Sequence, residues 1–171
     1  IGATTMTHEI TPGLKMYRVT CPIGVIGVIF ESRPDALVQI ASLALKSGNA
    51  VLLKGGREAE RTNAALCDAL REATADVGLP ADFAQLLHSR EDVAAMLKED
   101  ALIDPIIPRG SKEFVRYIMD NSRIPVLGHS DGICHVYVDK SADVEMAVSI
   151  AVDSKAQNVA VCNACETLLG H

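Results

Sequence analysis

Short apolar runs alternate with amphipathic stretches along most of the chain, and this alternation constrains the fold more than any other feature. Residues 21–30 form a continuous run rich in Val and Ile, which is typical of a strand buried on both faces of a parallel sheet. Five further segments carry the same signal more briefly. Strands are therefore also predicted at residues 50–54, 85–87, 102–107, 125–127 and 134–138.

Helical patterns fill the intervals between these strands. Gly48 and Gly78 stand where helices commonly stop, and Ser111 is a residue type that caps a helix N-terminus. The predicted helices cover residues 34–46, 58–77, 91–98, 111–121 and 143–154. The polar opening before residue 21 is assigned no element. The alternation predicts an α/β fold with a mostly parallel, Rossmann-like sheet and helices on both faces.

Composition excludes several classes of protein. A length of 171 residues, with 49% apolar and 22% charged residues, suits one globular domain or one domain plus a piece of another. A net charge of −6 and the lack of Trp argue against a nucleic-acid partner. The apolar run 23–30 is too short to cross a membrane, so no membrane partner is expected either.

The cysteines and the chain ends bear on localisation and completeness. Five scattered cysteines do not form an obvious disulfide framework, so a reducing, cytoplasmic location is expected. The chain starts without Met, and the apolar residues 168–171 look like a strand that has only begun. We therefore expect a fragment of a longer protein.

One glycine loop follows the strand predicted at residues 50–54. Lys54 precedes Gly55 and Gly56, and Arg57 leads into the next helix. Bare glycines let a ligand approach the backbone, and the two cations add positive charge. A glycine-rich turn with solvated charges is the alternative interpretation.

A second glycine loop follows the strand predicted at residues 102–107. Arg109, Gly110 and Ser111 stand between this strand and a helix, as in an anion-binding helix start, although Ser111 as a simple cap is the alternative. Ligands of open α/β sheets lie beyond the carboxyl ends of strands. Both loops together therefore predict a phosphate-bearing cofactor.

Cys162 and Cys165 form a Cys-x-x-Cys pair. Such a pair is typical of a zinc site, of a redox dithiol, or of a functional cysteine beside one that only packs. A zinc site needs two more ligands, and Cys134 and His135 are adjacent and far upstream. Spacing alone leaves these alternatives open, with two buried thiols as the simplest.

Several segments, in order along nearly the whole chain, resemble the gamma-glutamyl phosphate reductases, a branch of the aldehyde dehydrogenase superfamily. They are residues 22–34, 45–49, 107–110, 131–137, 162–164 and 166–169. The resemblance implies an aldehyde dehydrogenase-like NADP-binding domain over residues 1–155 and the start of a catalytic domain over residues 156–171. The same segments resemble the reductase module of delta-1-pyrroline-5-carboxylate synthase, in which a glutamate kinase precedes it.

The activity implied by the resemblance is NADPH-dependent reduction of L-glutamyl 5-phosphate to L-glutamate 5-semialdehyde and phosphate, in proline biosynthesis. It also implies a homo-oligomer when full length, with fusion to or association with glutamate kinase. The alternatives are another acylating aldehyde dehydrogenase, a non-catalytic nucleotide-binding piece, and a Cys-x-x-Cys redox or zinc module.

The resemblance also implies residue roles in catalysis. Cys162 aligns with the nucleophile that forms a thioester, and Ser32 replaces an Asn that helps to hold the oxyanion. Val126 stands where hydrolytic relatives carry a Glu that activates water, so the thioester is expected to persist. Phosphate or carboxylate groups of the substrate are assigned to three further residues: Arg33, Arg109 and Asn163.

For the cofactor, Lys54 matches a Lys that contacts the adenosine ribose. Arg57 replaces a Glu that often binds ribose hydroxyls, and a cation there favours a 2′-phosphate, hence NADPH over NADH. The other implied contacts come from the two glycine loops, with the second facing the pyrophosphate: Gly55, Gly56, Gly110 and Ser111.

Overall fold

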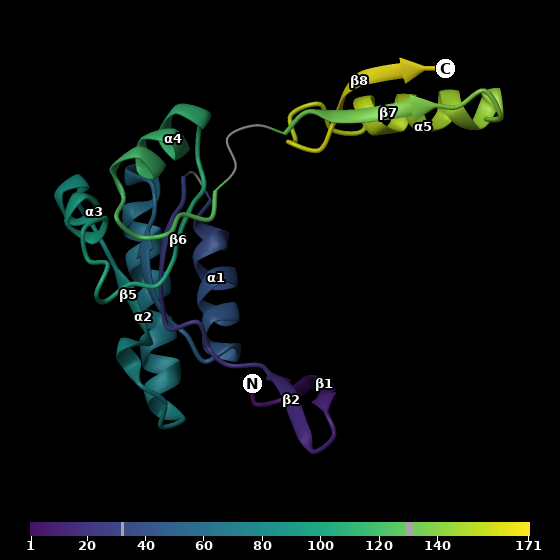
Figure 1. The fold of residues 1–171 in the computed structure, drawn as a ribbon. Coiled ribbons are helices and arrows are strands. Elements are labelled where there is room, and N and C mark those ends of the chain that lie inside the picture. The colour runs from purple at the N-terminus through teal and green to yellow at the C-terminus, as the bar shows by residue number, and fades with distance from the viewer. Residues whose placement is uncertain (32, 129–131) are drawn as a thin grey trace. The chain divides into compact units, whose positions relative to one another are not determined.

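The computed structural model describes residues 1–31, 33–128 and 132–171. It divides into two compact units, Ile1–Gly128 and His129–His171. The first contains an N-terminal hairpin and a four-stranded α/β sheet, and the second contains a strand, a helix and a strand (Figure 1). No helix among the described residues is long and apolar enough to cross a membrane.

The hairpin pairs β1 (Thr4–Thr11) with β2 (Leu14–Val19) in antiparallel register. Gly13 in the connecting turn has φ 87°, a conformation that favours glycine. Every residue of both strands is exposed, and apolar and polar residues alternate only in short stretches such as Leu14, Lys15 and Met16. The sequence-based assignment of no element to this polar opening was wrong for that reason.

The central sheet has the strand order β5-β4-β3-β6, and all its pairs are parallel. Its strands are β3 (Val25–Ile29), β4 (Ala50–Lys54), β5 (Ala84–Leu86) and β6 (Ile106–Pro108). β3 lies in the middle and pairs with β4 on one side and with β6 on the other. The carboxyl ends of all four strands consequently meet at one edge of the sheet.

Helices cover both faces of this sheet, as predicted (Figure 1). The helices of this unit are α1 (Pro34–Lys46), α2 (Glu60–Asp76), α3 (Arg90–Met96) and α4 (Lys112–Asn121), with short 3₁₀ turns η1 (Arg57–Ala59) and η2 (Ala81–Phe83). Residues of α1 and α2 pack in one core cluster with Val28 and Phe30. Residues of α3 and α4 pack in a second cluster with Ile29, because successive side chains of a strand point to opposite faces.

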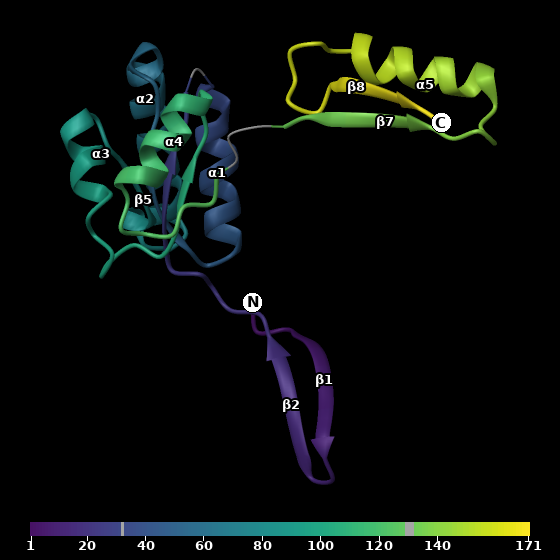
Figure 2. The ribbon, with the colours of Figure 1, turned by 45° about the horizontal axis from the view of Figure 1, so that its top comes forward.

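The second unit consists of β7 (Cys134–Val138), α5 (Val144–Ala156) and β8 (Cys165–Gly170). β7 and β8 pair in parallel, and α5 lies beside them (Figure 2). Asp143 caps α5 through its Oδ1, which accepts from the Met146 N–H at 2.9 Å. The expected domain limits, 1–155 and 156–171, stay a prediction.

Three predicted strands are shorter than expected. The run predicted as a strand at residues 21–30 forms one only at Val25–Ile29. The segment predicted at residues 102–107 forms a strand only at Ile106–Pro108, since Leu102 and Ile103 turn back to the Glu99 carbonyl at 3.0 Å. Pro105 supplies no N–H for a sheet hydrogen bond. The segment predicted at residues 125–127 makes a single bridge, between Val126 and Ile106.

Candidate functional site

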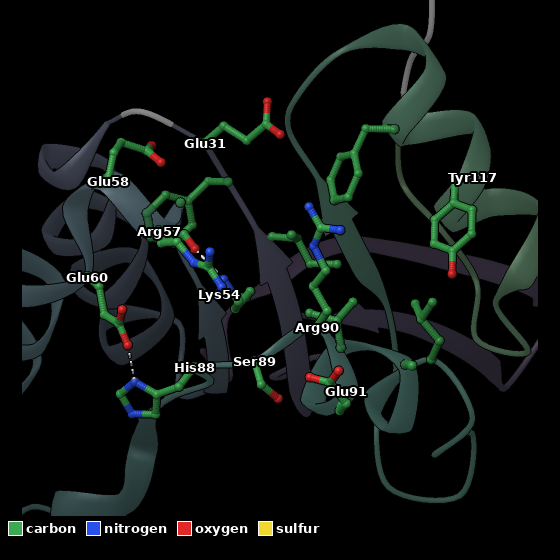
Figure 3. Close-up of a pocket in the computed structure, with 18 residues that line it drawn as sticks. Glu31, Lys54, Arg57, Glu58, Glu60, His88, Ser89, Arg90, Glu91 and Tyr117 are labelled. Atoms are coloured by element: carbon green, nitrogen blue, oxygen red, sulfur yellow. Dashed lines mark hydrogen bonds and ion pairs between the residues drawn. The ribbon is translucent and has the colours of Figure 1, made fainter.

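A cleft of about 1240 Å³ lies at the carboxyl ends of β3, β4 and β5 (Figure 3). Its walls come from segments far apart in the sequence: the ends of β3 and β4, the loop into α2, the start of α3, and α4. This is the position where open α/β sheets bind ligands. The sheet therefore puts a concavity where the sequence predicted a cofactor.

The loop from Lys54 to Arg57, here named the Gly-Gly loop, forms one wall, so all four predicted cofactor residues of this loop line the cleft. Lys54 Nζ donates to the Gly55 carbonyl at 2.6 Å. Within the described part of the chain, the N–H groups of Gly55, Gly56 and Arg57 have no hydrogen-bond acceptor. Unpaired N–H groups beside two cations make a wall suited to a phosphate.

The opposite wall begins where β5 ends, at His88, Ser89 and Arg90. Ser89 caps α3 in a capping box, in which its Oγ accepts from the Asp92 N–H at 2.9 Å. The Asp92 carboxylate accepts from the N–H groups of Ser89 and His88, and these bonds hold the pKa of Asp92 below its usual value. The caps fix the start of this short helix and thereby the place of Arg90.

Charged side chains of both signs reach the cleft (Figure 3). Lys54, Arg57 and Arg90 point into it, and His88 Nδ1 lies 3.6 Å from Glu60 Oε1. Neither Arg57 nor Arg90 makes an ion pair with any residue that the structure describes. Both guanidinium groups are thus available to an anionic ligand. Three more carboxylates line the cleft: Glu31, Glu58 and Glu91.

The remaining wall is apolar and aromatic. Phe114 and Tyr117 are three positions apart on α4 and therefore lie on one side of that helix. Val93, Ala94 and Leu97 face the cleft from the α3 segment. A planar aromatic ring fits against such a surface.

The second predicted loop, Arg109 to Ser111, adjoins the cleft without lining it. A Cβ at Gly110 would lie 2.9 Å from Phe114 Cδ1 and 3.0 Å from Glu31 Oε2, and both of these residues line the cleft. Arg109 N donates to the Ile29 carbonyl at 2.7 Å. Ser111 Oγ accepts from the Phe114 N–H at 3.3 Å, so Ser111 caps α4.

Cys162 belongs to the second unit, in the turn between α5 and β8, and it is exposed, as is its neighbour Asn163. Cys134 Sγ donates to the Cys162 carbonyl at 3.8 Å. Cys165 is buried, and its thiol donates to the Thr167 carbonyl at 3.3 Å. Of the Cys-x-x-Cys pair, one thiol is accessible and the other is packed. Among the described residues, no group of three or more His, Cys, Asp or Glu is placed to hold a metal ion.

Two other predicted residues, Arg33 and Val126, do not line the cleft. Ser32 falls outside the described residues. Arg33 is the exposed residue at the start of α1, where its carbonyl accepts from the Ala36 N–H at 3.0 Å. Val126 packs against the second core cluster. The roles assigned to these residues stay predictions.

The sequence reasoning missed several residues of the cleft. His88 was noted without a partner, and the structure gives it Glu60. Arg90 and the aromatic pair on α4 were not singled out. His88 and Arg90 directly follow β5, so their place after a parallel strand is the signal that would have found them.

Comparison with known proteins finds similar sequences over the whole chain. The model of the aldehyde dehydrogenase family matches residues 2–171. Gamma-glutamyl phosphate reductases of Pelotomaculum thermopropionicum and Acetivibrio thermocellus are 67% and 65% identical to the chain over 171 residues, which is 100% of this chain but 39% and 40% of those proteins. The chain thus spans about 40% of the length of these curated relatives.

Solved structures of similar proteins superpose on this chain as well. The crystal structure of the gamma-glutamyl phosphate reductase of Thermotoga maritima superposes with a TM-score of 0.93 at 38% identity, over 100% of this chain and 42% of that one. A propionaldehyde dehydrogenase of Rhodopseudomonas palustris is 22% identical to this chain and superposes with a TM-score of 0.67. The match covers 89% of this chain and 34% of that protein's chain, and it shows a shared fold.

Proposed function

The chain belongs to the aldehyde dehydrogenase family, and we propose that the whole protein reduces L-glutamyl 5-phosphate to L-glutamate 5-semialdehyde and phosphate with NADPH, as a step of proline biosynthesis. The observation that carries this proposal is the 67% identity, over the full chain, to a protein named gamma-glutamyl phosphate reductase. The cleft supports it with a site suited to a dinucleotide. Self-association of the whole protein and a link to glutamate kinase stay predictions.

The residues of the cleft fit a nicotinamide dinucleotide. The unpaired N–H groups of the Gly-Gly loop and the Lys54 ammonium suit phosphate oxygens, and the Phe114 and Tyr117 side chains suit the adenine ring. Arg57 carries a positive charge where a carboxylate would bind the ribose hydroxyls of NADH. A guanidinium group binds a 2′-phosphate by charge-assisted hydrogen bonds, so NADPH is the preferred cofactor.

The accessible thiol of the Cys-x-x-Cys pair carries the covalent chemistry. Cys162, as thiolate, attacks the acyl carbon of L-glutamyl 5-phosphate, and the carbon–sulfur bond forms as the bond to the phosphate oxygen breaks. When bound, the nicotinamide supplies the hydride that reduces this thioester. Collapse of the thiohemiacetal then releases the aldehyde and regenerates the Cys162 thiolate.

Water must not intercept the thioester before reduction. Val126 is apolar and packs against the second core cluster, so it cannot act as the general base that hydrolytic relatives use. The thioester therefore persists until hydride or phosphate reaches it. This property distinguishes a phosphate-linked reductase from an enzyme that oxidises aldehydes to acids.

The reverse reaction tests the proposal: reduction of NADP⁺ by glutamate 5-semialdehyde, with and without phosphate, in the whole protein. We expect turnover only with phosphate, and none in Cys162→Ser, which should retain NADPH binding. Cys21→Ser is the matched control, because Cys21 is another exposed cysteine and the proposal gives it no role. Turnover without phosphate would show that the enzyme is hydrolytic. Full activity of Cys162→Ser would show that Cys162 is not the nucleophile.

A further inference from the structure

The turn that carries Cys162 lies against the start of β7. This turn connects α5 to β8, and Cys162 is exposed in it (Figure 2). β7 and β8 run in parallel and begin side by side, because Cys134 and Cys165 are register partners. The residues just before β7 therefore lie beside the residues just before β8. Contacts between these two segments determine where the Cys162 backbone is held.

Gly132 leaves room for the backbone of Cys162. A Cβ at position 132 would lie 2.8 Å from the Cys162 carbonyl oxygen. The next nearest atoms would be the carbonyl carbon and the Cβ of Cys162, at 3.8 Å and 3.9 Å. A side chain in place of Gly132 would therefore have to displace the backbone of Cys162, which is not the far end of a flexible side chain and cannot swing away.

Cys134 contacts the same carbonyl group through its side chain. Its Sγ lies 3.8 Å from the Cys162 carbonyl oxygen and donates to it, which is a weak hydrogen bond of the kind that thiols make. Among the described residues, no backbone N–H donates to this carbonyl. Gly132 and Cys134 thus lie against one oxygen atom, which belongs to the residue that carries the exposed thiol.

We propose that Gly132 and Cys134 are positioning residues for the Cys162 thiol. The carbonyl carbon and the Cβ of Cys162 are bonded to the same Cα, so a carbonyl that is held from β7 also sets the direction of the side chain. A thiol in an exposed turn would otherwise sample several directions, whereas attack on a carbonyl carbon requires a narrow range of approach. This role rests on the function proposed above, in which Cys162 is the nucleophile.

A single turnover of the whole protein without phosphate measures this positioning. The Cys162 thiolate adds to the carbonyl carbon of glutamate 5-semialdehyde, the hydroxyl group of the adduct loses its proton, and hydride passes to NADP⁺. The thioester then remains, because no phosphate is present to release it, and each chain forms one NADPH. The rate constant reports how well the thiol is placed, and the amplitude reports the fraction of chains that are folded and competent.

Gly132→Ala tests the close approach. Its methyl group would push the Cys162 carbonyl oxygen from 2.8 Å toward ordinary contact beyond 3.4 Å. We expect the rate constant to fall about tenfold with the amplitude unchanged, since a misplacement of about 1 Å costs about a hundredfold. Gly170→Ala is the matched control in the same unit, because a Cβ at Gly170 would meet none of the described residues within 4 Å. It should keep the rate constant and the amplitude of the wild type.

Cys134→Ala tests the second contact and keeps the proposal testable if Gly132→Ala does not fold. We expect a rate constant about two- to fivefold lower, the scale of a weak hydrogen bond, and Cys134→Ser, which keeps a hydroxyl donor, should lie nearer to the wild type. Wild-type rate constants in Gly132→Ala and Cys134→Ala, or a reduced amplitude at the wild-type rate constant, would overturn the positioning role, as would an equal slowing in Gly170→Ala. A wild type that forms no NADPH would refute the proposed function itself, and the positioning role would fall with it.

Discussion

Gly55 and Gly56 are neighbours in the same loop, yet the structure predicts different losses of stability when each is replaced by Ala. Neither glycine has a positive φ, and Gly56 is extended at φ −65° and ψ 152°, which any residue can adopt. The difference lies in what a new methyl group would meet. At Gly55 it would collide with the buried Asn63 amide and lie 3.2 Å from Phe30 Cε2. At Gly56 it would meet only the carboxylate of Glu58.

The two environments differ in how easily they give way. Asn63 and Phe30 are 2% and 3% exposed, so neither can move without disturbing the core, and overpacking of this kind costs about 1–3 kcal/mol. Replacing Gly by Ala also restricts the unfolded chain, which stabilises the protein by about 0.4–1 kcal/mol. The net change for Gly55→Ala is a loss of about 0–2.6 kcal/mol. For Gly56→Ala the methyl group meets the far end of the flexible, exposed Glu58 side chain rather than buried atoms, so Gly56→Ala should be less destabilising than Gly55→Ala.

Urea unfolding of the whole protein, followed by circular dichroism, measures both changes, and each variant serves as the control of the other. NADPH titration of the same samples should show weaker binding by Gly55→Ala, because Asn63 and the Gly-Gly loop shift together. Equal free energies of unfolding for the two variants would refute the claim that Asn63 requires a glycine at position 55.

Two further predictions concern charge. Arg57→Glu should lower the preference for NADPH over NADH by about ten- to hundredfold, because a charged hydrogen bond contributes about 1.5–3 kcal/mol. The control Arg61→Glu reverses an exposed charge outside the cleft and should leave the ratio of the two Kd values unchanged. Hydrogen bonds from Ser89 and His88 lower the pKa of Asp92 in the folded protein. Wild type should therefore be more stable than Asp92→Asn, and this advantage should be full above the unfolded-state pKa of the carboxyl group. The advantage should disappear as the pH falls through the lowered folded-state pKa. An advantage that does not vary between neutral and strongly acidic pH in urea titrations would contradict this assignment.

Much of the fold was predictable because its signals are local. One helix start was found through a side chain that acts on its own first turn, Ser111, and this residue caps α4 in the structure. The strand at Ala50–Lys54 was found with its bounds because its apolar run is short and flanked by polar residues and glycines. The alternation of elements then predicted a parallel sheet, and the four parallel strands confirm it.

The missed elements lack such signals. The hairpin has no buried face, and its apolar residues, such as Leu14 and Met16, alternate with polar ones only over short stretches. Strand order also depends on long-range pairing, which no local pattern contains. β3 pairs with β4 and β6, and the sequence alone gave no reason to place β6 there rather than at the edge beyond β5.

The candidate site was predictable in part for the same reason. The Gly-Gly loop was found through its own residues, but Arg90 and Phe114 reach the cleft from helices α3 and α4. Asn63, which lies against Gly55, was missed because it stands in the buried stripe of α2 with Cys67 and Thr74, and a helical pattern treats such positions as packing. A polar amide in that stripe is the signal to look for in related sequences.

The pairing of β3 with β6 has a consequence for the order in which the molecule folds. Val25 N donates to Asp104 Oδ2 at 2.8 Å across 79 positions of sequence, and Gly27 pairs with Ile106 next to it. Closing so long a loop is slow and costs chain entropy, whereas β3, α1 and β4 can assemble from neighbouring segments. β6 leads directly into α4, which carries Phe114 and Tyr117. We therefore expect a nascent chain to acquire its nucleotide cleft late, once β6 has docked on a sheet that is already partly formed.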